Sequence, residues 1–362
     1  MTIVKAADLK LAIEKINKAI FIDKGIIVSN YIFIEAKENE GRIHITNIDN
    51  HFEAFFPLQG DDFRAIVSAD LFIKYVNKLN DVKEIAFDLL DEGLQIKQGN
   101  SKAVFAMGDI AEDDFSLFEK IKLDGEVNKI SYEDLKKVLD YLPSAVDENF
   151  YNPEYTCFLI SENQALSTNA YKLCGLNINL FGLSTPYLLT FKLVKYMQGI
   201  TNAGDLFFGV DEQGLHFYND KIHILGLPYE SDRIERMVSA CNILLTKNYT
   251  GSIVIDKALL NEALDRLSLF INMEVKTVLK METKENNLIL TNIKDTGREV
   301  IPVSNETGDI LETSWYVDVS YFKTLFNVLV GDRITIKYDK DESTISLSDG
   351  VCNQVLALTT LE

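Results

Sequence analysis

Three stretches of this chain are versions of one another, and this repeat constrains the fold more than any other feature. A Glu-Asn pair recurs after 124 and then 123 residues, and a Thr-Asn pair recurs after 122 and then 123 residues. The pairs begin at Glu38, Glu162 and Glu285, and at Thr46, Thr168 and Thr291. A constant period of about a third of the chain indicates three copies of one domain. Such a repeat favours an assembly built by symmetry over a single catalytic cleft.

Each copy carries the same succession of patterns. A first helix is predicted from apolar residues at i, i+3, i+4 and i+7, and it lies at residues 8–20, 134–142 and 257–270. A hairpin then surrounds each Glu-Asn turn. A second helix, introduced by Ser68, by Ser184 with Pro186, and by Asp318 or Ser320, precedes a second hairpin. The second helices are expected at residues 71–79, 187–197 and 322–329.

The fold class is therefore α+β, with three tandem domains that each consist of two helix-plus-hairpin halves. The joints are expected near Gly125 and Asn248. The predicted domains are residues 1–124, 125–247 and 248–362.

The net charge is −19, from 36 basic and 55 acidic residues, which at first sight excludes nucleic acid as a partner. The distribution of charge changes this view. The six predicted helices together carry +3, which leaves −22 for the rest of the chain. Lysines also pair by helical spacing, at Lys15 and Lys18, Lys74 and Lys78, and Lys192 and Lys195. These helices either present a mildly positive face to a polyanion or simply carry solvated lysines on amphipathic surfaces.

Cysteine spacing and apolar runs indicate an intracellular protein. The four cysteines, Cys157, Cys174, Cys241 and Cys352, form no CxxC pair, so reduced structural thiols are expected. Neither a signal peptide nor an apolar run of 18 residues is recognisable. We expect a cytoplasmic, nucleoid-associated protein with no membrane partner.

Motifs for catalysis or metal binding are missing from the sequence. No GxxxxGK[ST], HExxH, GxSxG or EF-hand spacing occurs, and the four histidines are too few and too scattered to predict a metal site. Acidic groups fall at predicted turns, where solvated carboxylates are expected. We expect neither enzymatic activity nor a cofactor.

Several segments resemble the bacterial DNA polymerase III beta subunit, the sliding clamp, and the resemblance covers the whole chain in order. Residues 30–34 and 46–49 resemble the family's first hairpin, and residues 102–107 with 113–115 resemble the closing strand of domain one and its following turn. Residues 167–173, Ser-Thr-Asn-Ala-Tyr-Lys-Leu, stand where the family has Ala-Thr-Asp-Gly-His-Arg-Leu. Residues 355–361 resemble its final apolar strand without the Met-Pro-Met-like core.

The resemblance implies a ring of two head-to-tail chains, with helices lining a channel around duplex DNA and sheets forming the outer rim. Helical cations would then attract phosphates without reading bases, so that the ring is held yet slides. The candidate DNA-facing residues are Lys10, Lys15, Lys18, Lys24, Lys74, Lys78, Lys136, Lys137, Lys192, Lys195, Arg266 and Lys323.

The resemblance also implies a homodimer contact and a pocket for partner peptides. At the contact, Phe105 and Met107 should meet Phe270 and Ile271 of the second chain. The pocket would bind the replicative polymerase, the ATP-dependent clamp loader and other proteins that carry clamp-binding motifs. Its candidate residues are Tyr155, Thr168, Ala170, Tyr171, Lys172, Leu173, Arg236, Met237, Val275, Asp318, Tyr321, Thr344, Val355, Leu356, Ala357, Leu358, Thr359, Thr360 and Leu361. Core packing is the alternative role for each apolar member.

The departures from the family pattern at Ala170, Tyr171 and Lys172 predict a pocket of altered shape. Two other functions compete with the clamp. An acidic DNA mimic or protein-sequestering inhibitor would explain the net charge, but it should keep its acids on one continuous face, and the helices are the least acidic part. A multidomain enzyme with an unrecognised acid pair has no motif to support it.

Overall fold

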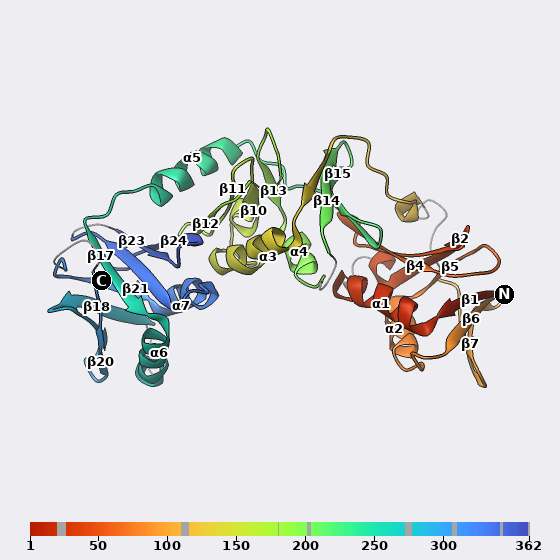
Figure 1. Cartoon of the computed structure of the whole chain (residues 1–362), viewed down its shortest axis with the longest axis horizontal. Helices are drawn as coiled ribbons and strands as arrows, with labels where there is room; N and C mark the ends of the chain where they lie inside the picture. Colours follow the sequence, from red (N-terminus) through yellow and green to blue (C-terminus); the bar gives the residue numbers. More distant parts are fainter. Residues whose placement is uncertain are drawn as a thin grey trace. The chain divides into compact units, whose positions relative to one another are not determined.

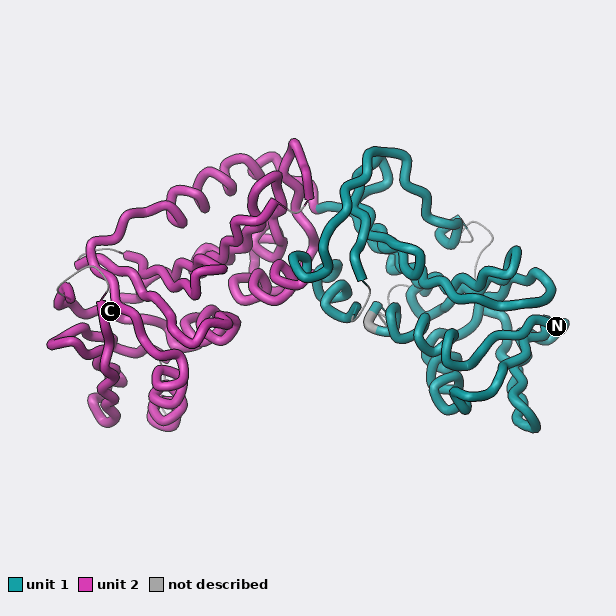
Figure 2. The backbone as a smooth tube through the Cα atoms, viewed as in Figure 1, with its two compact units in different colours: residues 1–135, 192–228 teal, residues 136–191, 229–362 magenta. Residues whose placement is uncertain are grey.

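The protein is shown in Figure 1 as a computed structural model. The structure describes residues 1–19, 27–109, 116–179, 181–200, 204–271, 277–305, 310–340 and 343–360. The chain divides into two compact units, formed by residues 1–135 with 192–228 and by residues 136–191 with 229–362 (Figure 2). The proposed three-domain boundaries are a separate division of the chain and stay a prediction. No helix in the described residues is long and apolar enough to span a membrane.

The first unit contains two antiparallel sheets, ordered β5-β2-β3-β4-β16-β15-β14-β9 and β1-β6-β7-β8. Its strands are β1 (Thr2–Lys5), β2 (Tyr31–Lys37), β3 (Glu40–Thr46), β4 (Asn50–Pro57), β5 (Phe63–Ser68), β6 (Glu84–Leu90), β7 (Gly93–Gln98), β8 (Ser101–Phe105), β9 (Val127–Ile130), β14 (Leu206–Asp211), β15 (Gly214–Tyr218) and β16 (Ile222–Gly226). Its helices are α1 (Ala6–Ile16), α2 (Ala69–Val76) and α4 (Phe191–Met197), of which only Phe191 belongs to the second unit.

The second unit repeats this design, with sheets ordered β13-β10-β11-β12-β24-β23-β22-β17 and β20-β19-β18-β21. Its strands are β10 (Phe158–Ile160), β11 (Gln164–Thr168), β12 (Lys172–Asn177), β13 (Tyr187–Leu189), β17 (Gly251–Asp256), β18 (Val278–Lys284), β19 (Asn287–Asn292), β20 (Arg298–Pro302), β21 (Thr313–Asp318), β22 (Arg333–Tyr338), β23 (Thr344–Ser348) and β24 (Cys352–Ala357). Its helices are α5 (Ile234–Leu245), α6 (Lys257–Ile271) and α7 (Val319–Val328), and α3 (Tyr132–Tyr141) begins before residue 136.

The first helices bury the stripes that the sequence predicted. Leu9, Ala12, Ile13 and Ile16 of α1 are buried, as are the corresponding apolar residues of α6. Burying one leucine or isoleucine side chain contributes about 1.5–3 kcal/mol. The stripe therefore holds each helix against its sheet.

The repeated Thr-Asn pair has one structural role in all three copies. The side-chain oxygens of Asn47 and Asn169 each accept the N–H three residues later, at 2.8 Å, and so fix the turn into the next strand. Asn292 accepts the N–H of Gly297, because its turn is two residues longer. Asn219 and Asp349 repeat the contact in the second halves of copies two and three. An Asn or Asp side chain that accepts a backbone hydrogen bond in this way is a strong sequence signal for a turn.

The repeated Glu-Asn pair forms hairpin turns. In the first and third copies, Glu38, Asn39, Glu285 and Asn286 all have positive φ, between 48° and 66°. Two consecutive residues of this kind suit the right-handed twist of the flanking strands. The hairpins predicted from this repeat are confirmed as β2–β3, β10–β11 and β18–β19.

Three expectations need correction. The second helix of the middle copy begins at Phe191, because Tyr187–Leu189 pairs with β10 as strand β13, so Pro186 precedes a strand and not a helix. Ser68 precedes α2 but its side chain makes no capping bond, whereas Asp318 accepts the N–H groups of Ser320 and Tyr321. Helix α5 was not predicted at all, although Met237, Val238 and Cys241 pack on the second unit's large sheet.

Candidate functional site

The two large sheets share one way of joining half-sheets. Each eight-stranded sheet consists of two four-stranded halves, here called half-sheets. One edge of a half-sheet is a strand that leads directly into a helix, and the other edge is the third strand of a three-stranded meander. In the large sheets, two third strands pair antiparallel, β4 with β16 and β12 with β24. The pair at the centre of each joint lies five residues after the turn Asn or Asp, at Phe52 and Ile224 and at Cys174 and Gln354. The two joints therefore use the same register.

Two third strands have no such partner. Among the described residues, no strand pairs with the outer side of β8 or of β20, which end the two four-stranded sheets. The turn before β8 matches the other turns, because Gln98 faces Ser101 and Gly99 has a φ of 58°, close to that of Ala170. An edge strand presents unpaired N–H and C=O groups. Both edges are thus templates for a further strand.

The predicted dimer residues divide between core and surface. Phe105 and Ile271 are buried, and Phe105 packs edge-on against Phe72 and Tyr75 of α2. Met107 and Phe270 are each 42% exposed. A Cβ on Gly297 would lie 2.9 Å from the Phe270 ring, so this glycine lets the ring lie against the start of β20.

Several helical cations predicted to face DNA are held by carboxylates or carbonyls of their own unit. The Lys10 ammonium donates to the carbonyls of Asn77 and Leu79 and pairs with Asp81. Arg266 binds both carboxylate oxygens of Glu299 at 2.9 Å. The other pairs are Lys74 with Asp70 at 2.8 Å, Lys136 with Asp140 at 3.9 Å and Lys323 with Asp265 at 3.1 Å.

The remaining candidates include a positive cluster in the first unit. Burial lowers the pKa of Lys15, and the nearby ammonium of Lys221 lowers it further. Lys221 precedes β16 and was missed by the sequence reasoning, because no helix contains it. Lys78, Lys137, Lys192 and Lys195 are exposed on or beside helices α2, α3 and α4. Lys24 and the side chain of Lys18 lie outside what the structure describes.

The turn between β11 and β12 organises most of the predicted peptide pocket. Thr168 donates to the carbonyl of Lys172 at 2.7 Å, and Ala170 takes a φ of 70°, which the family's glycine would adopt more easily. The Tyr171 ring, half exposed, stacks on Tyr321 with centroids 5.8 Å apart. Tyr155 extends this surface through Phe150, whose ring lies 5.7 Å from Tyr155 and 6.4 Å from Tyr171.

Strand alternation separates the predicted pocket residues onto two faces of the sheet. Leu173 and Val355 lie on the face covered by α5, in a cluster that includes Met237. Lys172 and Leu356 lie on the other face, where the Lys172 ammonium donates to the Ser144 carbonyl at 2.8 Å and to Thr324 at 3.2 Å. Burial lowers the pKa of Lys172. This lysine therefore ties the sheet to α7.

The other members lie around the same joint. Thr344 of β23 faces Ala357 and bonds to Tyr249 and Lys247, and the N–H groups of Leu358 and Thr359 bond to Ser343 and Tyr316. Asp318 caps α7, Arg236 is exposed on α5, and Thr360 is exposed in the tail. Val275 and Leu361 lie outside the described residues.

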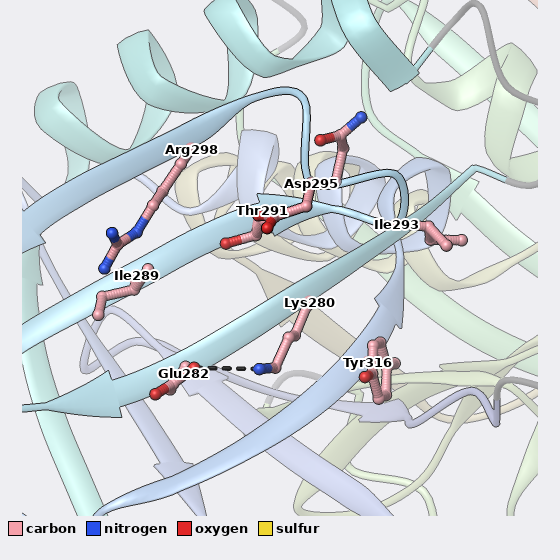
Figure 3. Close-up of a pocket in the computed structure, with 9 residues that line it drawn as sticks. Lys280, Glu282, Ile289, Thr291, Ile293, Asp295, Arg298 and Tyr316 are labelled. Atoms are coloured by element: carbon pink, nitrogen blue, oxygen red, sulfur yellow. Dashed lines mark hydrogen bonds and ion pairs between the residues drawn. The ribbon is translucent and has the colours of Figure 1, made fainter.

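A shallow depression of about 320 Å³ lies on the sheet face opposite α6 (Figure 3). Lys280 and Glu282 of β18 form an ion pair at 3.1 Å on its floor. Arg298 begins β20 at one side, and the long turn of Ile293 and Asp295 borders it. The depression therefore adjoins the unpaired edge of β20.

Comparisons with known proteins agree on the fold. No protein-family model and no curated protein matches the chain. The DNA polymerase III subunit beta of Pseudomonas aeruginosa superposes with a TM-score of 0.84 at 12% identity, and that of Thermotoga maritima with 0.84 at 15%, each with full coverage of both chains. A putative DNA polymerase III beta subunit from Eubacterium rectale gives 0.85 at 16% identity, covering 99% of this chain and 98% of that one.

The chain therefore has the α+β fold of the DNA polymerase III beta subunits and sliding clamps, and the resemblance predicted from the sequence is confirmed at the level of the fold. The low identity fits a divergent form of that fold.

Proposed function

We propose that this protein is a DNA sliding clamp, a non-enzymatic processivity factor whose two head-to-tail chains encircle duplex DNA and tether a replicative polymerase. Each chain would supply three clamp domains, at residues 1–124, 125–247 and 248–362. An ATP-dependent loader would open the ring, and other proteins with clamp-binding motifs would share its docking site. The protein would act in the cytoplasm, at the nucleoid. The observation that carries this proposal is the pair of unpaired third strands, β8 and β20.

The register of the proposed contact follows from the two joints inside the chain. If β8 and β20 pair as β4 pairs with β16, the central residues are Ala103 of one chain and Glu299 of the other. Val104 then lies opposite Arg298, and Lys102 lies opposite Val300. Hydrogen-bonded and non-hydrogen-bonded pairs alternate along β7–β8 and β19–β20. The N–H and C=O groups of Lys102, Val104, Arg298 and Val300 therefore point away from their own sheets, toward the unpaired edges. Two such contacts close a ring of two chains.

The same register accounts for the exposed apolar residues near these edges. Val104 is 40% and Val300 is 52% exposed, and the pairing would place them diagonally across the new contact. Val104 would also lie beside Arg298, which lines the depression. On the other face, Met107 would approach Phe270, as expected from the resemblance.

A channel of helices would hold DNA by charge without reading its sequence. Lys15 and Lys221 are the best candidates in the first unit, because their two positive charges lie close together. Lys10, Lys74 and Arg266 would contribute less than the sequence suggested.

Partner peptides would dock on the α5 side of the β12–β24 joint. Tyr171, which stands where the resembling family has a histidine, adds an aromatic ring that stacks on Tyr321 of α7. Lys172 is turned to the opposite face, so it would support the site rather than contact the peptide. We therefore expect a peptide preference that differs from that of typical clamps.

Retention on DNA of different topology tests the proposal. The protein is incubated with its loader, ATP and nicked circular duplex, and the DNA is separated by gel filtration. A clamp stays with the circle and is lost after a single restriction cut. Equal loss from circular and linear DNA would contradict the ring. If the protein instead bound a partner protein and DNA displaced it from that partner, the result would support the acidic mimic.

A further inference from the structure

All four histidines of the chain gather at one place in the fold, the joint between β4 and β16. His44 and His51 come from one hairpin, and His216 and His223 come from the other. Each pair follows the pattern His-x-x-Asn-x-x-x-His around the turn asparagine. Because the joint is symmetric about Phe52 and Ile224, the two pairs occupy equivalent positions in its two halves.

The histidines form two hydrogen-bonded pairs. His44 Nε2 lies 3.3 Å from His51 Nδ1, and His216 Nδ1 lies 3.0 Å from His223 Nε2. His216 also contacts the Asp211 carboxylate at 2.9 Å. In the β4–β16 register, His223 lies opposite Glu53, and Glu53 lies opposite His44. Glu53 of β4 therefore lies between a histidine of one pair and a histidine of the other.

Three of the four histidines are buried, and His51 is partly exposed. His44 and His216 are fully buried, and the Nδ1 atom of His44 has no hydrogen-bond partner. Phe118 covers His44 edge-on at 5.4 Å, and its carbonyl accepts a hydrogen bond from Arg42 at 2.9 Å. The N–H of Ile121 donates to Glu53 at 3.3 Å. The segment of residues 116–121 is thus fastened over the histidines by the same charged groups that surround them.

Burial and the nearby Arg42 oppose a positive charge on His44, whereas the Glu53 carboxylate lies 3.6 Å from its Nδ1 atom. Arg42 already supplies one cation, which pairs with Glu53 and with Glu35. Burial lowers the pKa of His44 well below its usual range, and also lowers the pKa of His51 and, to about 3, that of His223. The charged and titratable groups that face the cluster are Glu35, Arg42, Asp49, Glu53, Arg64, Lys120, Asp211 and Tyr218. None of the groups of His, Cys, Asp and Glu in the described residues is arranged to hold a metal ion.

The second joint of the chain lacks this chemistry. At β12–β24, Leu166 and Leu173 occupy the positions of His44 and His51, and Val355 occupies that of Leu225. These residues are buried in an apolar cluster under α5. Titratable imidazoles are therefore a feature of one joint, although both joints have the same backbone register.

We propose that the β4–β16 joint is an acid-sensitive latch, which neutral histidines keep closed and which opens when they take up protons. Opening would separate β4 from β16 and release the cover of residues 116–121. This inference concerns the first unit alone and does not depend on the proposed function.

The sign and size of the effect follow from proton linkage. The closed joint holds His44, His51 and His223 neutral, whereas the open joint restores a pKa near 6.5 to each of them, so the open state binds more protons and is favoured as pH falls below about 6.5. Between pH 7.0 and 5.5 each fully neutral histidine raises the opening constant roughly 8-fold, and three raise it roughly 600-fold at most. Burial raises the pKa of Glu53, and proton uptake by this group in the closed state acts in the opposite direction.

Hydrogen exchange tests the latch within one molecule. Peptides from residues 50–57 and 222–226 report the histidine joint, and peptides from residues 172–177 and 352–357 report the leucine joint. After correction for intrinsic exchange rates, protection at the histidine joint should fall at least 10-fold from pH 7.0 to 5.5, while the leucine joint stays within 2-fold. Equal changes at both joints, or constant protection at β4 and β16, would overturn the proposal.

A variant separates protonation from general acid instability. His44→Leu with His51→Leu copies the leucine joint of the same chain and removes two titrating groups. The pH-dependent loss of protection should then shrink at least 5-fold. An undiminished loss in this variant would contradict the latch. If the variant folds poorly, the comparison of the two joints in the unaltered protein still decides the question.

Discussion

Replacing Val104 with proline should separate the two chains of the proposed ring while leaving each chain folded. Val104 lies in β8 opposite Gln95 of β7, and the narrow turn from Gln98 to Ser101 sets the alternation of the ladder. By that alternation the N–H of Val104 points away from β7, toward the unpaired edge. Proline is tolerated on an edge strand at such a position. The chain's own sheet therefore loses no hydrogen bond.

The loss appears only across the contact between chains. In the proposed register, Val104 and Arg298 of the second chain exchange two hydrogen bonds, as do Lys102 and Val300. Each bond contributes about 0.5–1.5 kcal/mol. Removing one donor also leaves the Arg298 carbonyl unsatisfied at about 1–3 kcal/mol. With the bulk of the proline ring, we expect a loss of about 2–4 kcal/mol per contact. Because separating the two chains breaks both contacts, the dissociation constant should rise roughly 1,000-fold to 1,000,000-fold.

Sedimentation velocity across a range of concentrations measures this shift. The unaltered protein and Val104→Thr, which keeps the N–H and a similar shape, should sediment as two chains at concentrations where Val104→Pro sediments as one. Circular dichroism should show the same folded content for all three. A Val104→Pro dimer as tight as that of the unaltered protein would refute the register.

Three further outcomes follow from individual contacts. Asn292→Ala removes the acceptor for the N–H groups of Thr296 and Gly297, so the second unit should lose about 1–3 kcal/mol of stability. This loss is measured by urea unfolding with the fluorescence of the single tryptophan, Trp315, in β21 of the same sheet. A full-amplitude transition at the original midpoint would contradict this role of the turn. Burial raises the pKa of Cys157 and of Cys241 to about 11, and all four thiols are buried. A thiol reagent at pH 8 should therefore label the native protein at least 100-fold more slowly than the unfolded chain. Rapid labelling of any one thiol would show that this thiol is not buried. Lys221→Gln should weaken binding to short linear duplex and reduce its salt dependence more than Lys10→Gln does, because the Lys10 ammonium is already tied to Asp81; equal effects of the two variants would contradict the assignment of Lys15 and Lys221 as the positive cluster.

The sequence predicted the parts of the fold that depend on local chemistry. The Thr-Asn and Glu-Asn repeats are turn signals, and their asparagines make the bonds that such residues make in turns. The stripes of α1 and α6 follow from helical spacing. Helix α5 also has an apolar stripe, at Ile234, Val238, Cys241 and Leu245, but it has no counterpart in the other copies and so fell outside the repeat.

Pairing between distant strands could not be predicted in the same way. The meeting of β4 with β16 joins residues about 170 apart, and no local pattern specifies it. The repeat itself held a clue that was overlooked, because the spacing of His44 and His51 recurs at His216 and His223. Ion pairs such as Arg266 with Glu299 depend on the packing of α6 against β20, so helical spacing alone overstated the free positive charge.

Position in the fold also changed the predicted peptide site. Lys172 and Leu173 are adjacent in sequence, but the pleat places them on opposite faces of β12. A sequence motif treats both as members of one pocket. The structure assigns Leu173 to the apolar cluster beneath α5 and Lys172 to the contact with α7.

Covalent closure of the ring on DNA tests the central claim most directly. Val104→Cys with Arg298→Cys places two thiols at residues that face each other in the proposed register, where Cα atoms about 5.5 Å apart suit a disulfide. The variant is loaded on nicked circular duplex, oxidised and then denatured in detergent. A ring around DNA predicts that protein stays with the circle through denaturation and is released by one restriction cut. Release of all protein before the cut, despite complete cross-linking between the chains, would contradict the claim that the ring encircles DNA.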